Sequence, residues 1–186
     1  MSDLHQDLRL LRNEADAATR REWNRSVPFP EALFDRWERA RVLGFGEGSS
    51  VFDSVHVLGQ VEVGRKVWIG PFVMLDGSGG LLTIGDHCDI SAGVHIYTHD
   101  TARRCVSMGA APILTGQVTI GSGSYLGSQA VVLPGVTIGS RCVVGSNSFV
   151  NTNLPDRTIA VGSPARPVGR VEGDGEDVRF VYSDQS

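Results

Sequence analysis

The sequence predicts an all-β solenoid, and three observations support that prediction. An aliphatic residue returns at every sixth position through most of the stretch from Val51 to Val150. The position after it is often glycine, and the fourth position after it is compact and mostly apolar. A helix has a period near 3.6 residues and cannot keep this beat on one face, whereas a short strand followed by a corner can. Stacked units of this kind form a coil whose aliphatic side chains point inward.

The repeat comprises fifteen six-residue units by direct count. Their inward aliphatics are Val51, Val57, Val63, Ile69, Leu75, Ile84, Ile90, Ile96, Leu114, Ile120, Leu126, Val132, Ile138, Val144 and Val150. Glycine follows the aliphatic in seven units, which indicates a backbone corner that a side chain would crowd. The six-residue spacing is interrupted by a small bulge after Leu75 and by a longer segment that leaves the coil after Ile96. Such insertions map to loops, often on the binding face.

Residues 1–48 are predicted to form an N-terminal helical extension. A first helix is expected within residues 1–26, because Leu4, Leu8, Leu11 and Ala15 recur at helical spacing. Prolines then break the helix, and Pro30 suits the first position of a second one. The second helix should end at Gly44 and Gly46 and carry on one side Leu33, Phe34, Trp37 and Ala40. We expect this extension to cap the first coil, with partner binding through Trp37 as the alternative.

Length and composition fit one domain with short extensions: 186 residues, 41% of them hydrophobic. The net charge of −4 and the lack of a basic tract argue against nucleic acid as a partner. There is no signal peptide and no apolar run that could span a bilayer, so we expect a cytoplasmic protein without membrane insertion. The acidic, glycine-rich tail, residues 172–186, is expected to be partly disordered.

The three cysteines form no metal or redox motif, which fits a reducing compartment. Cys88 and Cys142 fall at the compact inward position of their repeats, so we expect them to be buried as small apolar residues. Cys105 lies in the segment that leaves the coil and is expected to be exposed.

Four repeats, IGSGSY, LGSQAV, IGSRCV and VGSNSF, resemble those of the hexapeptide-repeat acyltransferases, in particular bacterial sugar O-acetyltransferases of the maltose, galactoside and polysaccharide type. The resemblance covers about residues 51–171, and residues 159–168 resemble the family's exit strand. It implies a left-handed parallel β-helix of about five triangular coils over residues 49–171, with a loop insertion at residues 98–113. It also implies a homotrimer with active sites between the subunits.

His99 is the candidate catalytic residue. The Tyr97-Thr98-His99 stretch is similar to the family's catalytic segment, which implies that His99 is a general base. An acceptor hydroxyl must lose its proton as it attacks a thioester, and an imidazole with a pKa near 6.5 suits that task. The acceptor-binding candidates around it are Asp76, His95, Tyr97 and Asp100. Asp76 is also explained as a turn former beside Gly77, and His56 and His87 as ordinary surface residues.

The resemblance also implies acetyl-CoA as the acyl donor. The matching positions for the donor are Tyr125, Ser128, Gly145, Ser146 and Asn151, with Arg166 and Arg170 near the nucleotide phosphates. Tyr125 stands where many sugar acetyltransferases have tryptophan. The small residues would be small in any repeat of this kind, and the two arginines are also explained as solvated surface charge.

The sequence therefore predicts an acetyl-CoA-dependent O-acetyltransferase that acts on a sugar or nucleotide-sugar acceptor and requires no metal. The first alternative is an N-acetyltransferase for a nucleotide-linked amino sugar. The second is a non-catalytic scaffold or a metal-binding relative that would use His95, His99 and a further histidine. The identity of the acceptor lies beyond the sequence.

Overall fold

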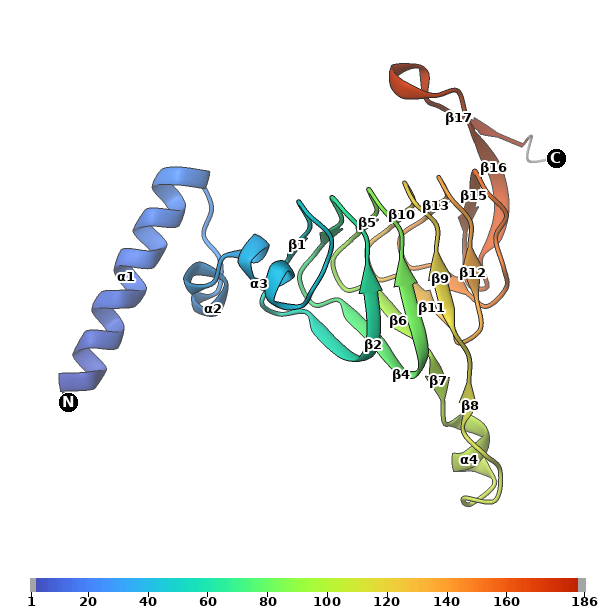
Figure 1. The fold of residues 1–186 in the computed structure, drawn as a ribbon, viewed down its shortest axis with the longest axis horizontal. Coiled ribbons are helices and arrows are strands. Elements are labelled where there is room, and N and C mark those ends of the chain that lie inside the picture. Colours follow the sequence, from blue (N-terminus) through green and yellow to red (C-terminus); the bar gives the residue numbers. More distant parts are fainter. Residues whose placement is uncertain (1–2, 184–186) are drawn as a thin grey trace.

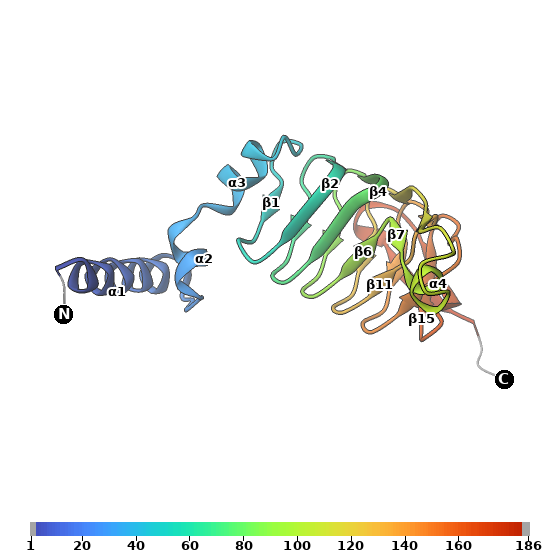
Figure 2. The ribbon, with the colours of Figure 1, turned by 90° about the horizontal axis from the view of Figure 1, so that it is seen from below.

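A helical arm, a body of stacked strands and two projections from that body make up the chain (Figures 1 and 2). They are seen in a computed structural model, which describes residues 3–183. The arm stands off one end of the body. One projection leaves the middle of the body, and the other is formed by the C-terminal strands.

The helical arm consists of α1 (Asp3–Trp23), α2 (Phe29–Leu33) and α3 (Arg36–Val42). The first predicted helix is confirmed, and none of its residues is buried. The prediction of a single second helix is wrong, because Asp35 divides it. The Asp35 side chain accepts hydrogen bonds from the N–H groups of Trp37 and Glu38 and so begins α3 as its N-cap.

Within the arm, α3 is the element that covers the first coil. Of the four apolar residues expected on one side of the second helix, only Ala40 is buried. The Arg39 guanidinium donates to the Val55 carbonyl at 2.7 Å and to the Phe52 carbonyl, which ties α3 to the first turn of the body. The longer helix α1 instead packs on α2.

Three parallel ladders of short strands form the body. The first consists of β1 (Ser50–Val51), β3 (Trp68–Ile69), β5 (Asp89–Ile90), β10 (Tyr125–Leu126), β13 (Val143–Val144) and β15 (Thr158–Val161). The second consists of the first halves of β2 (His56–Val63) and β4 (Met74–Ile84), followed by β6 (His95–Tyr97), β11 (Val131–Val132) and β14 (Phe149–Val150). The third consists of the second halves of β2 and β4, followed by β9 (Val118–Ile120) and β12 (Thr137–Ile138).

The strand register follows the six-residue repeat. Val51 pairs with Ile69, and Leu126 pairs with Val144, so strands in one ladder lie three repeats apart in the regular turns. The chain thus passes through the first, second and third ladders in turn. Parallel stacking and the helical extension are confirmed, while the hand of the coil stays a prediction.

The inward positions form one hydrophobic core, as predicted, except that Val57 is half-buried and packs against the core and Leu114 lies outside it. Leu114 is 52% exposed and pairs with Asp100 outside the body, because the chain re-enters a ladder only at Val118, and Ile120 is the next inward aliphatic after Ile96. Leu154 completes the third ladder instead: it is buried and bridges Ile138. The compact fourth positions are buried, including Cys88 and Cys142, whereas Cys105 is exposed.

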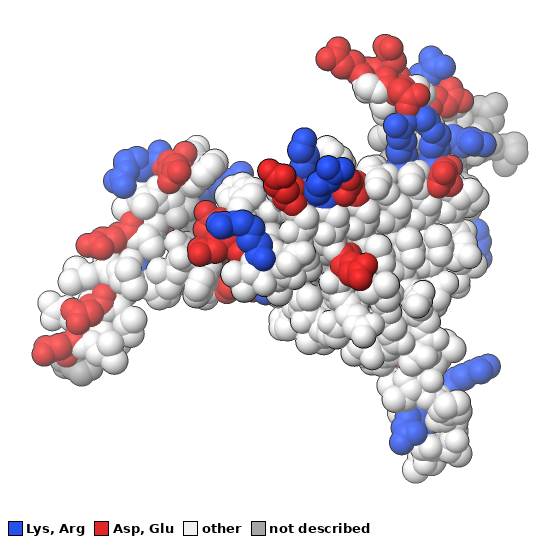
Figure 3. Space-filling view, in the orientation of Figure 1, with Lys and Arg blue, Asp and Glu red and all other residues white. Residues whose placement is uncertain are grey.

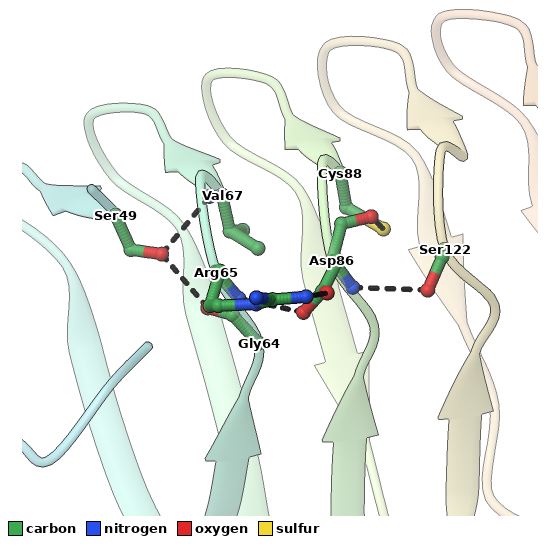
Figure 4. Close-up of polar contacts among 7 residues, drawn as sticks. All are labelled: Ser49, Gly64, Arg65, Val67, Asp86, Cys88 and Ser122. Atoms are coloured by element: carbon green, nitrogen blue, oxygen red, sulfur yellow. Dashed lines mark hydrogen bonds and ion pairs between the residues drawn. The ribbon is translucent and has the colours of Figure 1, made fainter. Parts of the chain in front are cut away.

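The corners between the third and first ladders, some of which Figure 4 shows, contain four of the seven recurring glycines: Gly64, Gly85, Gly121 and Gly139. A side chain at one corner accepts the N–H of the corner before it: Arg65 N–H donates to Asp86 Oδ1 at 2.8 Å, and Asp86 N–H donates to Ser122 Oγ at 3.0 Å. These bonds hold successive corners close together. A Cβ added at Gly121 would lie 2.4 Å from the Ser140 nitrogen, so the predicted crowding is confirmed.

The projection from the middle of the body is an excursion between β6 and β9 (Figure 1). It contains β7 (His99–Asp100), the short helix α4 (Ala102–Val106) and β8 (Leu114–Thr115). The strands β7 and β8 pair antiparallel and hold the base of the excursion together. The excursion is therefore a small structured unit that begins at the end of β6, a strand of the second ladder.

The predicted partial disorder of the C-terminal tail is wrong for its described residues, which form an ordered projection. Strand β16 (Arg166–Glu172) pairs antiparallel with β15, and a short 3₁₀ helix, η1 (Gly175–Asp177), leads to β17 (Arg179–Tyr182), which pairs with β16. Ion pairs tie this acidic segment to the body, because Asp174 contacts both Arg141 and Arg157. Residues 184–186 of the predicted tail lie outside the described residues.

Charged side chains are unevenly distributed over the surface. In the view of Figure 3 they gather on the helical arm, along one edge of the body and on the C-terminal hairpin, while the strands of the body present almost none. No helix within residues 3–183 has the length and apolar character needed to cross a bilayer.

Candidate active site

His99 lies at the first residue of β7, where the chain leaves the second ladder. Its Nδ1 atom is 2.8 Å from Asp76 Oδ2, and its side chain is 35% exposed. The two residues come together because Asp76 pairs with Tyr97 in the parallel register of β4 and β6. The excursion thus begins directly beside the bulge of the preceding coil.

The Asp76 carboxylate is fully engaged within this group. Its side chain is 2% exposed, and its Oδ1 atom accepts hydrogen bonds from the Ser78 N–H at 3.0 Å and from the Ser78 hydroxyl. An ionised carboxylate only accepts hydrogen bonds, so the Nδ1 atom of His99 carries the hydrogen that points at Asp76. The Nε2 atom of a neutral His99 ring then keeps its lone pair. This arrangement can accept a proton at Nε2 while the carboxylate fixes the tautomer.

Thr98 fixes the backbone beneath His99. It is fully buried, its hydroxyl donates to the Asp76 carbonyl at 2.8 Å and accepts from the Gly79 N–H at 2.9 Å. The Gly116 N–H donates to the Thr98 carbonyl at 2.9 Å, so both ends of the excursion are bound to one residue. Gly79 has no room for a side chain: a Cβ there would lie 2.6 Å from the His99 Cβ.

The remaining acceptor candidates occupy different positions. His95 and Tyr97 form a pair on the outside of β6, with His95 Nδ1 3.1 Å from the Tyr97 hydroxyl and the rings edge to face. Both are half-buried. Asp100 turns away from His99 and accepts a hydrogen bond from the Ala102 N–H, which shapes the start of α4. Asp76 is buried against His99 and does not present a free carboxylate to the surface.

The donor candidates fall on two corners of the body. Tyr125, Ser128, Gly145 and Ser146 lie on the first ladder or at the corner leading to the second, and the Asn147 N–H donates to the Ser128 carbonyl across adjacent coils. Asn151 follows the second ladder, on the same side as His99. The two groups are separated by the width of the second ladder, up to about 20 Å for a six-residue extended unit.

Arg166 and Arg170 both lie on β16, where Arg166 pairs with Val161 of β15 and Arg170 pairs with Thr158. Both are exposed, and neither forms an ion pair with a carboxylate of residues 3–183. The structure does not bring them to His99. They border the end of the first ladder, beyond Gly145, whose added Cβ would meet Val161 at 2.7 Å.

The cysteines take no part in this site. Burial raises the pKa of the Cys88 and Cys142 thiols, which keeps them protonated at neutral pH. Over the described range 3–183, no three His, Cys, Asp or Glu side chains are grouped closely enough to hold a metal ion. His56 and His87 are exposed, as expected.

Sequence reasoning missed Ser78, Thr98 and Gly79 as parts of the site. One feature of the sequence could have indicated them: the six-residue repeat is interrupted after Leu75 and again after Ile96. These two interruptions fall on neighbouring strands of the second ladder. The spacing alone does not reveal which side chains of the bulge meet the excursion.

Residues 117–152 match the family described as bacterial transferase hexapeptide (six repeats). The Mycobacterium tuberculosis protein named probable acetyltransferase Rv3034c is 32% identical over 133 residues, which are 60% of this chain and 44% of that protein. The chain thus spans less than half the length of this curated relative.

Two solved structures share the fold. AntD, an N-acyltransferase from Bacillus cereus in complex with dTDP and 3-hydroxybutyryl-CoA, has a TM-score of 0.60 and 25% identity, covering 67% of this chain and 70% of AntD. The hexapeptide-repeat acetyltransferase VCA0836 from Vibrio cholerae, complexed with acetyl coenzyme A, has a TM-score of 0.54 and 25% identity, covering 93% of this chain and all of VCA0836. The chain is thus similar to hexapeptide transferases over residues 117–152, and to the two solved acyltransferases in its fold.

Proposed function

We propose that the protein is an acetyl-CoA-dependent acetyltransferase that uses His99 as its general base. One observation supports this most strongly: the imidazole is held through Nδ1 by a buried carboxylate, while the ring remains 35% exposed. A surface histidine without a role needs no such partner. An oriented base at the start of a projecting segment is suited to a bound acceptor.

In the proposed reaction, Nε2 of His99 removes the proton of an acceptor hydroxyl as that oxygen attacks the thioester carbonyl. The C–O bond forms, the C–S bond breaks, and the imidazolium returns the proton to the departing thiolate. Asp76 stays ionised and stabilises the imidazolium between these steps. We therefore assign Asp76 to holding His99 in place of the acceptor-binding role that the sequence predicts.

The donor is proposed to lie along Tyr125, Ser128, Gly145, Ser146 and Asn151, with Arg166 and Arg170 toward its nucleotide phosphates. Several of these positions are small, which permits close approach of a thin pantetheine arm to the backbone. The complexes of VCA0836 with acetyl coenzyme A and of AntD with an acyl-CoA support a donor of this class.

We further propose a homotrimer, a left-handed coil and active sites shared between subunits. Most donor candidates and His99 lie on opposite edges of the second ladder, so one chain alone does not bring them together. A cyclic arrangement places one edge of each chain against the other edge of its neighbour. The scarcity of charge on the body in Figure 3 is compatible with contact between chains.

A sugar hydroxyl is the proposed acceptor, with His95, Tyr97 and Asp100 nearby. The second candidate is the amino group of a nucleotide-linked sugar, and it is favoured by the likeness to AntD, an N-acyltransferase solved with dTDP. Both reactions use the same donor and differ in the attacking atom.

Two measurements test the proposal. Acetyl-CoA should raise the melting temperature of the protein, because a ligand that binds only the folded state stabilises it. A panel of hydroxyl and amino sugars, free and nucleotide-linked, should then yield one product heavier by an acetyl group in mass spectrometry. Absence of both stabilisation and product across the panel would contradict the proposed activity.

A further inference from the structure

A cleft lies where the helical arm joins the first coil of the body. Its volume is about 330 Å³, which is within the range of sites that hold small ligands. Residues of α1, α2 and α3 line it, together with the segment between α1 and α2 and with Phe52 of the first coil. The cleft shares no residue with the group around His99.

Two indole rings form an accessible aromatic wall of this cleft. Trp23, the last residue of α1, and Trp37 of α3 have ring centroids 6.3 Å apart and planes tilted by 31°. Trp23 is 51% exposed and Trp37 is 40% exposed, although both line the cleft. A ligand can therefore reach them from solvent and bury part of their apolar surface.

The Arg36 guanidinium is held at the same place by two further ring contacts. Its Cζ atom lies 4.8 Å from the centroid of Trp37 and 4.6 Å from the centroid of Phe52. Such contacts between a guanidinium and aromatic rings fix the position of the charge. Burial and the nearby charge of Arg25 lower the pKa of Arg36, and the carboxylates of Glu31 and Asp35 oppose this shift.

The carboxylates of the cleft do not pair with its two arginines. Within residues 3–183, neither Arg25 nor Arg36 forms an ion pair. Glu31 instead accepts hydrogen bonds from the N–H groups of residues 53 and 54, at 2.8 Å and 3.0 Å. Asp35 accepts the N–H groups that begin α3, and Glu22 is exposed. The cleft therefore presents two unpaired guanidinium groups beside an aromatic wall.

We propose that this cleft binds a small aromatic ligand that carries an anionic group, either a carboxylate or a phosphate. The anionic oxygens accept hydrogen bonds from the Arg36 guanidinium, and Arg25 adds a second positive charge. The ring of the ligand packs against Trp23 and Trp37. A guanidinium binds carboxylate and phosphate alike through two parallel hydrogen bonds, so the paired anionic oxygens are the shared chemistry. The proposal does not depend on acetyl transfer.

Binding measured by NMR on the full chain tests the cleft. The probes are phenyl phosphate, benzoate and benzyl alcohol, which share a ring and differ in charge. The chain has three tryptophans, and the indole N–H resonances of Trp23 and Trp37 are identified by their loss in Trp23→Phe and Trp37→Phe. At least one of the two anions should move both resonances with an affinity roughly 10-fold or more above that of benzyl alcohol. The tighter anion identifies the preferred group.

Arg36→Gln should weaken binding of the anion by roughly 10-fold or more, read from the Trp23 resonance, because charge-assisted hydrogen bonds are lost. Arg41→Gln is the matched control and should keep wild-type affinity, since Arg41 lies on the same helix, is exposed and does not line the cleft. Arg25→Gln should weaken binding by about 2- to 5-fold. It keeps the test valid if loss of Arg36 disturbs the arm, because Arg25 is exposed and lies between two helices.

Three results would overturn the proposal. The first is equal affinity for the anions and benzyl alcohol, or resonances of Trp23 and Trp37 that no probe moves. The second is wild-type affinity in both Arg36→Gln and Arg25→Gln. The third is a loss in Arg41→Gln as large as that in Arg36→Gln. None of these outcomes bears on acetyl-CoA binding or on His99.

Discussion

Two glycines of the body face the same constraint with different consequences. At Gly121, in a regular corner, an added Cβ would lie 2.4 Å from the Ser140 nitrogen of the next coil. At Gly79, in the bulge, an added Cβ would lie 2.4 Å from the Thr98 carbonyl oxygen and 2.6 Å from the His99 Cβ. In the regular turns, close approach of the backbone sets the stacking. In the irregular turns, it sets the position of the proposed catalytic ring.

The largest effect on activity without loss of structure is expected at the partner of His99. Asp76→Asn should lower kcat by on the order of 10²–10⁴-fold, because the amide no longer fixes the tautomer and no longer stabilises the imidazolium. The Ser78 contacts can be retained by the amide oxygen. Steady-state rates and the melting temperature test this, and equal rates for Asp76→Asn and wild type would remove Asp76 from the mechanism.

The bulge glycine is the next most sensitive position. Gly79→Ala should reduce kcat by about 100-fold, because its methyl group displaces His99 and misplacement of about 1 Å can have this effect. Gly80→Ala is the matched control, since its nearest neighbour would be the Gln117 nitrogen at 3.3 Å. Similar rates for the two variants would show that the ring position does not depend on clearance at Gly79.

The regular corner should respond in stability. Gly121→Ala should reduce the free energy of unfolding by about 1–3 kcal/mol, the range for inserting a methyl group into a well-packed site. Gly80→Ala again serves as the control. Chemical denaturation measures the difference, and wild-type stability for Gly121→Ala would contradict the close stacking of corners.

The smallest effect is expected in the pH dependence of stability. Hydrogen bonds from the Arg65 backbone and side chain lower the pKa of Asp86. A lowered folded-state pKa gives stability that is present above the unfolded value and is lost as the pH falls through the folded one. Asp86→Asn should therefore flatten the acid side of the stability curve below about pH 4, measured by melting temperature. An acid limb as steep as that of wild type would exclude this contribution.

The regular part of the fold could be predicted from spacing because identical units stack in one register. The inward aliphatics, the compact fourth positions and the crowded glycines follow from that repeat. Leu114 fits the six-residue spacing but lies outside the body, because β7 and β8 pair with each other outside the ladders. The six-residue spacing does not predict Leu154 as an inward residue, because it lies four residues after Val150, yet it completes the third ladder.

The candidate site was less accessible to sequence reasoning, because its contacts cross between coils. The local stretch Tyr97-Thr98-His99 is enough to predict His99, whereas its link to Asp76 depends on the register between β4 and β6. Ser78 and Thr98 carry no motif, and their roles arise from hydrogen bonds across neighbouring turns. The break of the second helix at Asp35 and the ordered C-terminal hairpin likewise depend on particular polar contacts.

The most direct measurement is the single-turnover rate of acetyl transfer by His99→Ala, with an acceptor identified in the panel. The rate should fall by on the order of 10²–10⁴-fold, while acetyl-CoA binding and the melting temperature stay at wild-type values. Transfer at a rate close to that of wild type would contradict the proposal that the imidazole held by Asp76 takes the proton of the acceptor.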